Sequence, residues 1–187
     1  MTNKTGRITD REAWEAEELK EATLIQQLSE AYPCQNIEIK NPKTKENILL
    51  HSLLKEHKVV LFFRFKENDC DACIQHATKT LSEIAEHFPE MNIVILSGYG
   101  NVRQFYAYAQ TENHQLSVYN VNHLSIPVDD REIPYFFILT PALKIQNIFI
   151  LDKSDPTLTI RYLNVMQEKY WPGEHDHTHC THDHHSH

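Results

Sequence analysis

Two cysteines three positions apart, Cys70 and Cys73, lie where a β-branched and aromatic run ends and an amphipathic run begins. The first turn of a helix offers unpaired N–H groups and a partial positive charge, so a thiolate placed there is stabilised. Its pKa then falls below the free value of ~8.5. The outer thiolate can attack a disulfide of another protein, and the inner thiol can resolve the mixed disulfide. The spacing therefore predicts thiol-disulfide exchange.

Two other interpretations of this cysteine pair remain open. The two residues could be buried structural cysteines, or they could form half of a zinc site, which needs a second pair of ligands in the rigid fold. The immediate charges also matter, because Asp69 and Asp71 flank Cys70 and negative neighbours oppose a thiolate. We therefore expect a pKa less depressed than a neutral setting gives. That expectation favours a reductant or an isomerase over a strong oxidant.

The C-terminal stretch, residues 174–187, reads EHDHTHCTHDHHSH and holds seven of the 13 histidines in the chain. Neutral imidazole and thiolate are good ligands for zinc, nickel and copper. The stretch has no apolar residue to pack, so we expect it to be disordered without metal. We predict that it binds metal in solution, although exchange itself requires no cofactor. The candidate ligands are His175, His177, His179, Cys180, His182, His184, His185 and His187.

Composition excludes several classes of protein. The chain has 187 residues and a net charge of −8, and it shows no basic stripe, so nucleic acid is not an expected partner. No apolar run approaches the roughly 20 residues that a membrane helix requires. Four cysteines are too few for a disulfide scaffold in a chain of this length. The N-terminus has no hydrophobic signal region, which fits either a cytosolic protein or the mature form of an exported one.

The elements that must position the cysteines follow from hydrophobic periodicity. Strands that alternate with helices predict a parallel portion of sheet, and a terminal hairpin makes that sheet mixed. We expect a helical arm over residues 1–33, one domain over 34–172 and the histidine-rich tail over 173–187. The patterns predict helices around 12–31, 71–88, 101–113 and 154–171, and strands around 36–40, 58–65, 91–100, 116–121, 135–140 and 142–151. Residues 48–57 are ambiguous between strand and short helix.

These residues resemble the thioredoxin superfamily, in particular the TlpA/ResA-like redoxins, which are exported bacterial thiol-disulfide proteins. The resemblance covers about residues 36–168 and is most specific where Cys70 and Cys73 combine with Ile133-Pro134 ahead of a strand. It implies an α/β thioredoxin-like fold, with a central mixed β-sheet flanked by helices. It also implies that Cys70 is the attacking thiol, Cys73 the resolving thiol and Pro134 a cis-proline facing them.

The position of Pro134 has independent support, because a proline in a central strand is confined to the first residue and X–Pro bonds adopt cis more readily than others. Pro127 is the rival candidate. The resemblance further implies protein disulfides and dithiols as partners, and a place in the bacterial periplasm or cell envelope. It allows a lipid anchor upstream of the given chain. It gives no oligomeric state.

The chain departs from the family pattern at three places. Asp69 stands where a tryptophan is common, and the dipeptide between the cysteines is Asp71-Ala72, without proline. Arg64 stands six residues before Cys70, where thioredoxins often hold a buried acid. Arg64 can also be interpreted as a strand-edge charge that reaches solvent.

A peroxiredoxin-type peroxidase is disfavoured, because the threonine and proline that precede its reactive cysteine are missing from FRFKEND. The sequence thus predicts a thiol-disulfide oxidoreductase. The alternative is a non-enzymatic metal-binding or partner-docking protein on a degenerate thioredoxin scaffold.

Overall fold

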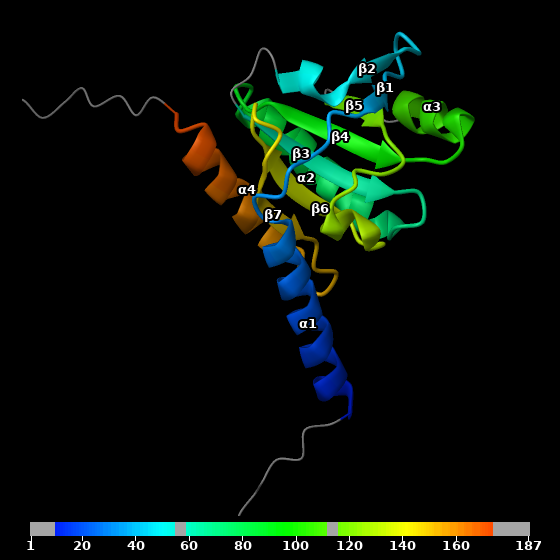
Figure 1. Ribbon diagram of the computed structural model, residues 1–187. Helices are drawn as coiled ribbons and strands as arrows, with labels where there is room; N and C mark the ends of the chain where they lie inside the picture. Colours follow the sequence, from blue (N-terminus) through cyan, green and yellow to red (C-terminus); the bar gives the residue numbers. More distant parts are fainter. Residues whose placement is uncertain (1–9, 55–58, 112–115, 174–187) are drawn as a thin grey trace, which may run out of the picture.

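The computed structural model describes residues 10–54, 59–111 and 116–173. Within these ranges, seven strands form one sheet in the order β2-β1-β5-β4-β3-β6-β7. Four α-helices and two short 3-10 helices, η1 and η2, accompany the strands (Figure 1). The elements are α1 (Asp10–Ser29), β1 (Glu38–Lys40), β2 (Asn47–Leu49), η1 (Leu50–Leu54), β3 (Val60–Lys66), α2 (Asp71–His87), β4 (Ile93–Gly98), α3 (Val102–Thr111), β5 (Ser117–Asn120), η2 (Pro127–Asp130), β6 (Tyr135–Leu139), β7 (Ile145–Ile150) and α4 (Thr157–Tyr170).

The sheet is mixed, which confirms the predicted fold class. Strands β3, β4 and β5 run parallel, as the alternation of strands and helices required. In the terminal hairpin, β6 runs antiparallel to β3, and β7 runs antiparallel to β6. The ambiguous stretch 48–57 contributes the end of the short edge strand β2 and then η1.

The strands bury both faces of the sheet, and side chains alternate between them. On one face Leu61 and Phe63 of β3 pack against α2 and α4. On the other face Val60 and Phe62 pack against the 3-10 helices and the loop that precedes β6. Arg64 follows the same alternation and therefore points to the second face. All seven residues of β3 except Lys66 are buried, so it is the central strand that its composition predicts.

Helix α2 covers the first face because its apolar side chains recur at helical spacing. Ile74, Ala77 and Leu81 are buried against the sheet, and Pro89 follows the helix end. Helix α4 covers the same face through Leu163 and Met166. It begins at Thr157, a few residues later than the predicted 154, and Pro156 is its N-cap residue.

Helix α1 is attached to the domain by its C-terminal end and extends away from the sheet at its N-terminal end (Figure 1). The Ser29 hydroxyl accepts a hydrogen bond from the Val128 N–H at 3.0 Å, and the Gln26 amide donates to the Ile148 carbonyl at 2.6 Å. Near the free end, Trp14 is 65% exposed. None of the helices that the structure describes has both the length and the apolar character needed to cross a bilayer.

Candidate functional site

The cysteine pair lies at the start of α2, directly after the turn that leaves β3. Cys70 is the N-cap residue of the helix, with φ −62° and ψ 108°, and its carbonyl accepts the N–H of Ile74 at 3.0 Å. Its sulfur accepts a hydrogen bond from the backbone N–H of Cys73 at 3.4 Å. A side chain at the N-cap normally binds an unpaired N–H of the first turn with an oxygen. Here a sulfur does so, which places the Cys70 sulfur beside the first turn of α2, where Cys73 lies.

The pKa values of the two thiols are shifted in opposite directions. Hydrogen bonds from the thiol and the backbone N–H of Cys73 lower the pKa of Cys70, with a further contribution from the charge of Lys153. Burial, together with the hydrogen bond and charge of Cys70, raises the pKa of Cys73 to about 11. Both are free, partly exposed thiols in this structure. Of the two thiols, Cys70 therefore loses its proton first as the pH rises, and Cys73 keeps its proton longer.

The acidic neighbour Asp69 does not face the thiolate in the way the sequence suggested. It is only 7% exposed, and its Oδ2 accepts the backbone N–H of Lys66 at 2.7 Å, which closes the turn after β3. Burial raises the pKa of this carboxyl, opposed by its hydrogen bond to Lys66 and by the charges of Lys66 and Arg64. Asp71 is exposed on the first turn of the helix. The turn thus engages one oxygen of Asp69, and burial favours the neutral form of this carboxyl.

Pro134 lies immediately before β6, at the end of the sheet where β3 stops. The antiparallel register pairs Arg64 with Tyr135, so Pro134 is level with the last residues of β3. Pro134 is buried, and its carbonyl accepts the N–H of Leu151 at 3.0 Å. The expectation of a cis bond was wrong, because every peptide bond among the described residues is trans. Trans is the commoner state of X–Pro bonds, and here it leads directly into the β6 ladder.

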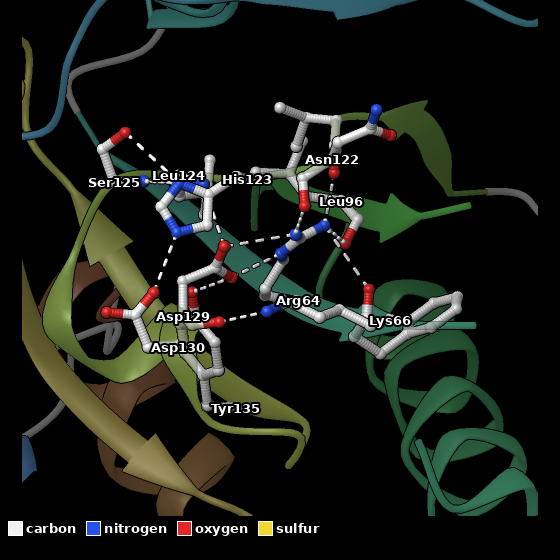
Figure 2. A network of polar contacts seen from close by, with 12 residues as sticks. Arg64, Lys66, Leu96, Asn122, His123, Leu124, Ser125, Asp129, Asp130 and Tyr135 are labelled. Atoms are coloured by element: carbon white, nitrogen blue, oxygen red, sulfur yellow. Dashed lines mark hydrogen bonds and ion pairs between the residues drawn. The ribbon is translucent and has the colours of Figure 1, made fainter. Parts of the chain in front are cut away.

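Arg64 is not an edge charge that reaches solvent, and that interpretation was wrong. The residue is 0% exposed, and Figure 2 shows its guanidinium lying against the carboxylate of Asp129. Nε donates to Asp129 Oδ1 at 2.7 Å, while Nη1 donates to the Val121 carbonyl at 2.8 Å and Nη2 to the Asn122 carbonyl at 2.9 Å. Register explains the burial, because position 64 follows Val60 and Phe62 onto the second face.

Asp129, from η2, is the centre of this buried network (Figure 2). Its carboxylate also accepts the Tyr135 hydroxyl at 2.9 Å and the Leu124 N–H at 2.9 Å. The Lys66 ammonium donates to its backbone carbonyl. Burial opposes ionisation, but the hydrogen bonds and charge of Arg64 hold the pKa of Asp129 below its usual value. The network ties the loop before Pro134 to the strand before Cys70.

Sequence reasoning missed Asp129, Tyr135 and Lys153. Asp129 lies in a stretch that resembles an ordinary polar loop, and no spacing rule connects it with Arg64 across 65 positions.

Cys34 is buried, and burial raises the pKa of its thiol to about 11, so it lacks the character of a nucleophile.

The predicted metal ligands His175 to His187, including Cys180, lie outside the described residues. Within the described ranges, no group of three or more histidine, cysteine or acidic residues could hold a metal ion. Metal binding by the tail therefore stays a prediction.

Comparison with solved structures finds the same fold in bacterial redoxins. A Bacteroides vulgatus protein assigned as a thiol-disulfide oxidoreductase superposes with a TM-score of 0.52 at 17% identity, over 73% of this chain and 98% of its own. A Chlorobium tepidum protein assigned as the interchange protein DsbE gives 0.56 at 11% identity, over 74% and 97%. The peroxidoxin BcpB from Mycobacterium tuberculosis gives 0.56 at 13% identity, over 74% and 98%.

No family model matches the sequence, and a search of curated proteins found no match. At such low identity, the structural likenesses establish the fold alone. The chain has the thioredoxin-like fold of the redoxins, which confirms the resemblance at that level. Because proteins assigned to thiol-disulfide chemistry and a peroxidoxin share this fold, the activity has to be argued from the site itself.

Proposed function

We propose that this protein is a thiol-disulfide oxidoreductase that acts on disulfides of other proteins. One observation supports the proposal most directly: Cys70 and Cys73, one helical turn apart, have pKa values shifted in opposite directions. Exchange needs one sulfur that is ionised at working pH and a second that keeps its proton until needed. Neither a structural nor a metal-binding role requires pKa values that differ between the two cysteines, so we do not favour the non-enzymatic alternative.

The chemistry consists of two balanced displacements. The Cys70 thiolate attacks one sulfur of the partner disulfide, forming a mixed disulfide while the other partner sulfur leaves as a thiolate. Cys73 then loses its proton to solvent and attacks the Cys70 sulfur. This step forms the Cys70–Cys73 disulfide and releases the second partner thiolate. The partner disulfide is reduced by two electrons and the cysteine pair is oxidised by two.

We place the docking surface for the partner at the end of the sheet where Cys70 and Pro134 both lie. Because Pro134 is buried and its carbonyl already accepts the Leu151 N–H, we propose that Pro134 supports this surface from within and leaves the contact with the partner to its exposed neighbours. By the same resemblance that suggested the chemistry, we propose that the protein works in the bacterial cell envelope.

Reduction of a purified protein disulfide by the dithiol form tests the proposal. Wild type should turn over the substrate in the presence of a chemical reductant, and Cys70→Ser should be inactive. Cys73→Ser should form a mixed disulfide with the substrate that persists and adds the substrate mass in intact-protein mass spectrometry. Equal rates for wild type and Cys70→Ser would refute the assignment, and so would a trapped adduct on Cys34 in place of Cys70.

A further inference from the structure

The loop between β7 and α4 emerges at the same end of the sheet as the cysteine pair. In the ladder, Arg64 of β3 pairs with Tyr135 of β6, and Tyr135 pairs with Ile150 of β7. Neighbouring strands lie ~4.8 Å apart, so the ends of β3 and β7 are separated by roughly 10 Å. Helices α2 and α4, which follow these two strands, cover the same face. The residues just after β7 therefore lie at the same end and on the same face of the sheet as the start of α2.

This loop is held in shape on both sides of Lys153. Before it, the Leu151 N–H binds the Pro134 carbonyl. Around it, the Asp152 carboxylate accepts the N–H of Ser154 at 2.7 Å and its hydroxyl at 2.6 Å. The backbone that carries Lys153 is therefore held in place, unlike the backbone of a fraying terminus.

Lys153 itself is exposed, and it has no ion pair or side-chain hydrogen bond with any other described residue. Its positive charge acts on both thiols, lowering the pKa of Cys70 and opposing the upward shift at Cys73. By comparison, the guanidinium of Arg64 is neutralised by Asp129, and Arg131 forms an ion pair with Glu21. Lys153 thus combines an effect on both thiols with the lack of a counter-ion among the described residues.

We infer that Lys153 is a positioning residue that sets the reactivity of Cys70 by holding a positive charge beside its thiolate. The inference rests on the proposed function, since it concerns the rate of the first displacement. The charge favours the ionised sulfur before attack and moderates its nucleophilicity once it is ionised. Other charged or titratable groups on the segments at this end of the sheet are Cys73 and Asp71 on the helix, Asp69 and Lys66 in the turn, Glu132 before Pro134, and Asp152 on the same loop as Lys153.

The decisive measurement is the pH profile of Cys70 alkylation by a neutral reagent, followed on the full chain by peptide mass spectrometry. In Lys153→Gln the midpoint should move to higher pH. The rate near neutral pH should fall about two- to fivefold, the effect expected of one exposed unit charge several ångström away. Above the midpoint the variant should match or exceed wild type, because a more basic thiolate is the better nucleophile. This crossing of the two profiles is an effect that mere loss of packing cannot produce.

Two further variants make the comparison specific. Lys153→Arg should restore the wild-type midpoint, since it keeps the charge. Lys144→Gln removes the same charge from the opposite end of β7 and should leave the profile unchanged. Added salt should reduce the difference between the alkylation midpoints of wild type and Lys153→Gln, because salt screens exposed charges.

Equal midpoints in Lys153→Gln, Lys144→Gln and wild type would overturn the inference. Alkylation needs no partner, so this result is independent of turnover. A wild-type chain that fails to reduce any protein disulfide would instead overturn the proposed function.

Discussion

Replacing Asp129 by asparagine would leave the Arg64 guanidinium buried without a carboxylate. Both side chains are 0% exposed, and the pair is bidentate, with Nε to Oδ1 at 2.7 Å and Nη2 to Oδ2 at 3.3 Å. The amide keeps the shape of the carboxylate, so the perturbation is mainly the loss of one charge. The NH₂ group of asparagine would also replace one carboxylate oxygen. It would then face two donors without an acceptor between them, either those of Arg64 and Tyr135 or those of Arg64 and Leu124.

The magnitude follows from burial. Removing one partner of a buried, hydrogen-bonded ion pair destabilises a protein by about 3–5 kcal/mol, because the remaining charge is left uncompensated. The free energy of unfolding of a single domain is about 5–15 kcal/mol, so Asp129→Asn should lose a large share of it. Replacing both residues by apolar ones of similar volume, as in Arg64→Met with Asp129→Leu, should recover only part of that loss, because the Tyr135 hydroxyl and the Leu124 N–H would still lose their acceptor.

The effect also has a defined dependence on pH. The pKa of Asp129 is lower in the folded state than in the unfolded chain, so its stabilising contribution is fully present above the unfolded value of ~3.9. That contribution is lost as the pH falls through the lower, folded value. The stability difference between wild type and Asp129→Asn should therefore be constant at neutral pH and shrink below about pH 4.

Urea unfolding followed by circular dichroism measures these differences, provided that the denaturant dependence stays the same across variants. Asp129→Glu keeps the charge but shifts the carboxylate, and it should fall between wild type and Asp129→Asn. A loss below about 1 kcal/mol for Asp129→Asn, the size seen for exposed pairs, would refute the claim that Arg64 depends on a buried counter-ion.

Two other predictions concern the rest of the chain. In Gly98→Ala the new Cβ would lie 2.9 Å from Arg64 Nη1 and 3.1 Å from Nη2, which are held by the Val121 and Asn122 carbonyls, so we expect a loss of about 1–3 kcal/mol in the same unfolding assay. Gly100→Ala, where the nearest atom is Glu67 Oε1 at 3.4 Å, is the matched control and should be near neutral. Replacing the tail ligands of residues 174–187 by serine should abolish zinc uptake in equilibrium dialysis, since imidazole and thiolate are the donors; equal uptake would contradict the prediction.

The fold could be predicted because its elements carry local signals. The apolar run that ends at Phe65 indicates where the central strand stops, and the helical spacing after Cys70 indicates where α2 starts. The Thr140-Pro141 turn between two apolar runs indicates the terminal hairpin. The stretch 48–57 could not be assigned, because a short edge strand followed by a 3-10 turn leaves too few residues for either period to show.

The site was only partly predictable, because its chemistry depends on contacts between distant segments. The cysteine pair and its helix are neighbours in sequence, so spacing alone places them. The direction of the Asp69 side chain depends on whether a turn offers it the Lys66 N–H, which composition does not reveal. The counter-ion of Arg64 comes from η2, and its choice depends on strand register.

Arg64 and Lys153 are both cations on segments that adjoin the end of the sheet where the cysteine pair lies, yet their fields differ in range. Arg64 and Asp129 together carry no net charge, and the field of such a pair decays faster with distance than that of a single charge. The pair therefore contributes stability and holds the loop before Pro134, with little influence on the thiolate. Lys153 is exposed and unpaired, so its field is screened but not cancelled. It follows that the acidity of Cys70 should respond to a substitution at the surface loop more than to one at the buried pair, even though the buried pair matters far more to folding.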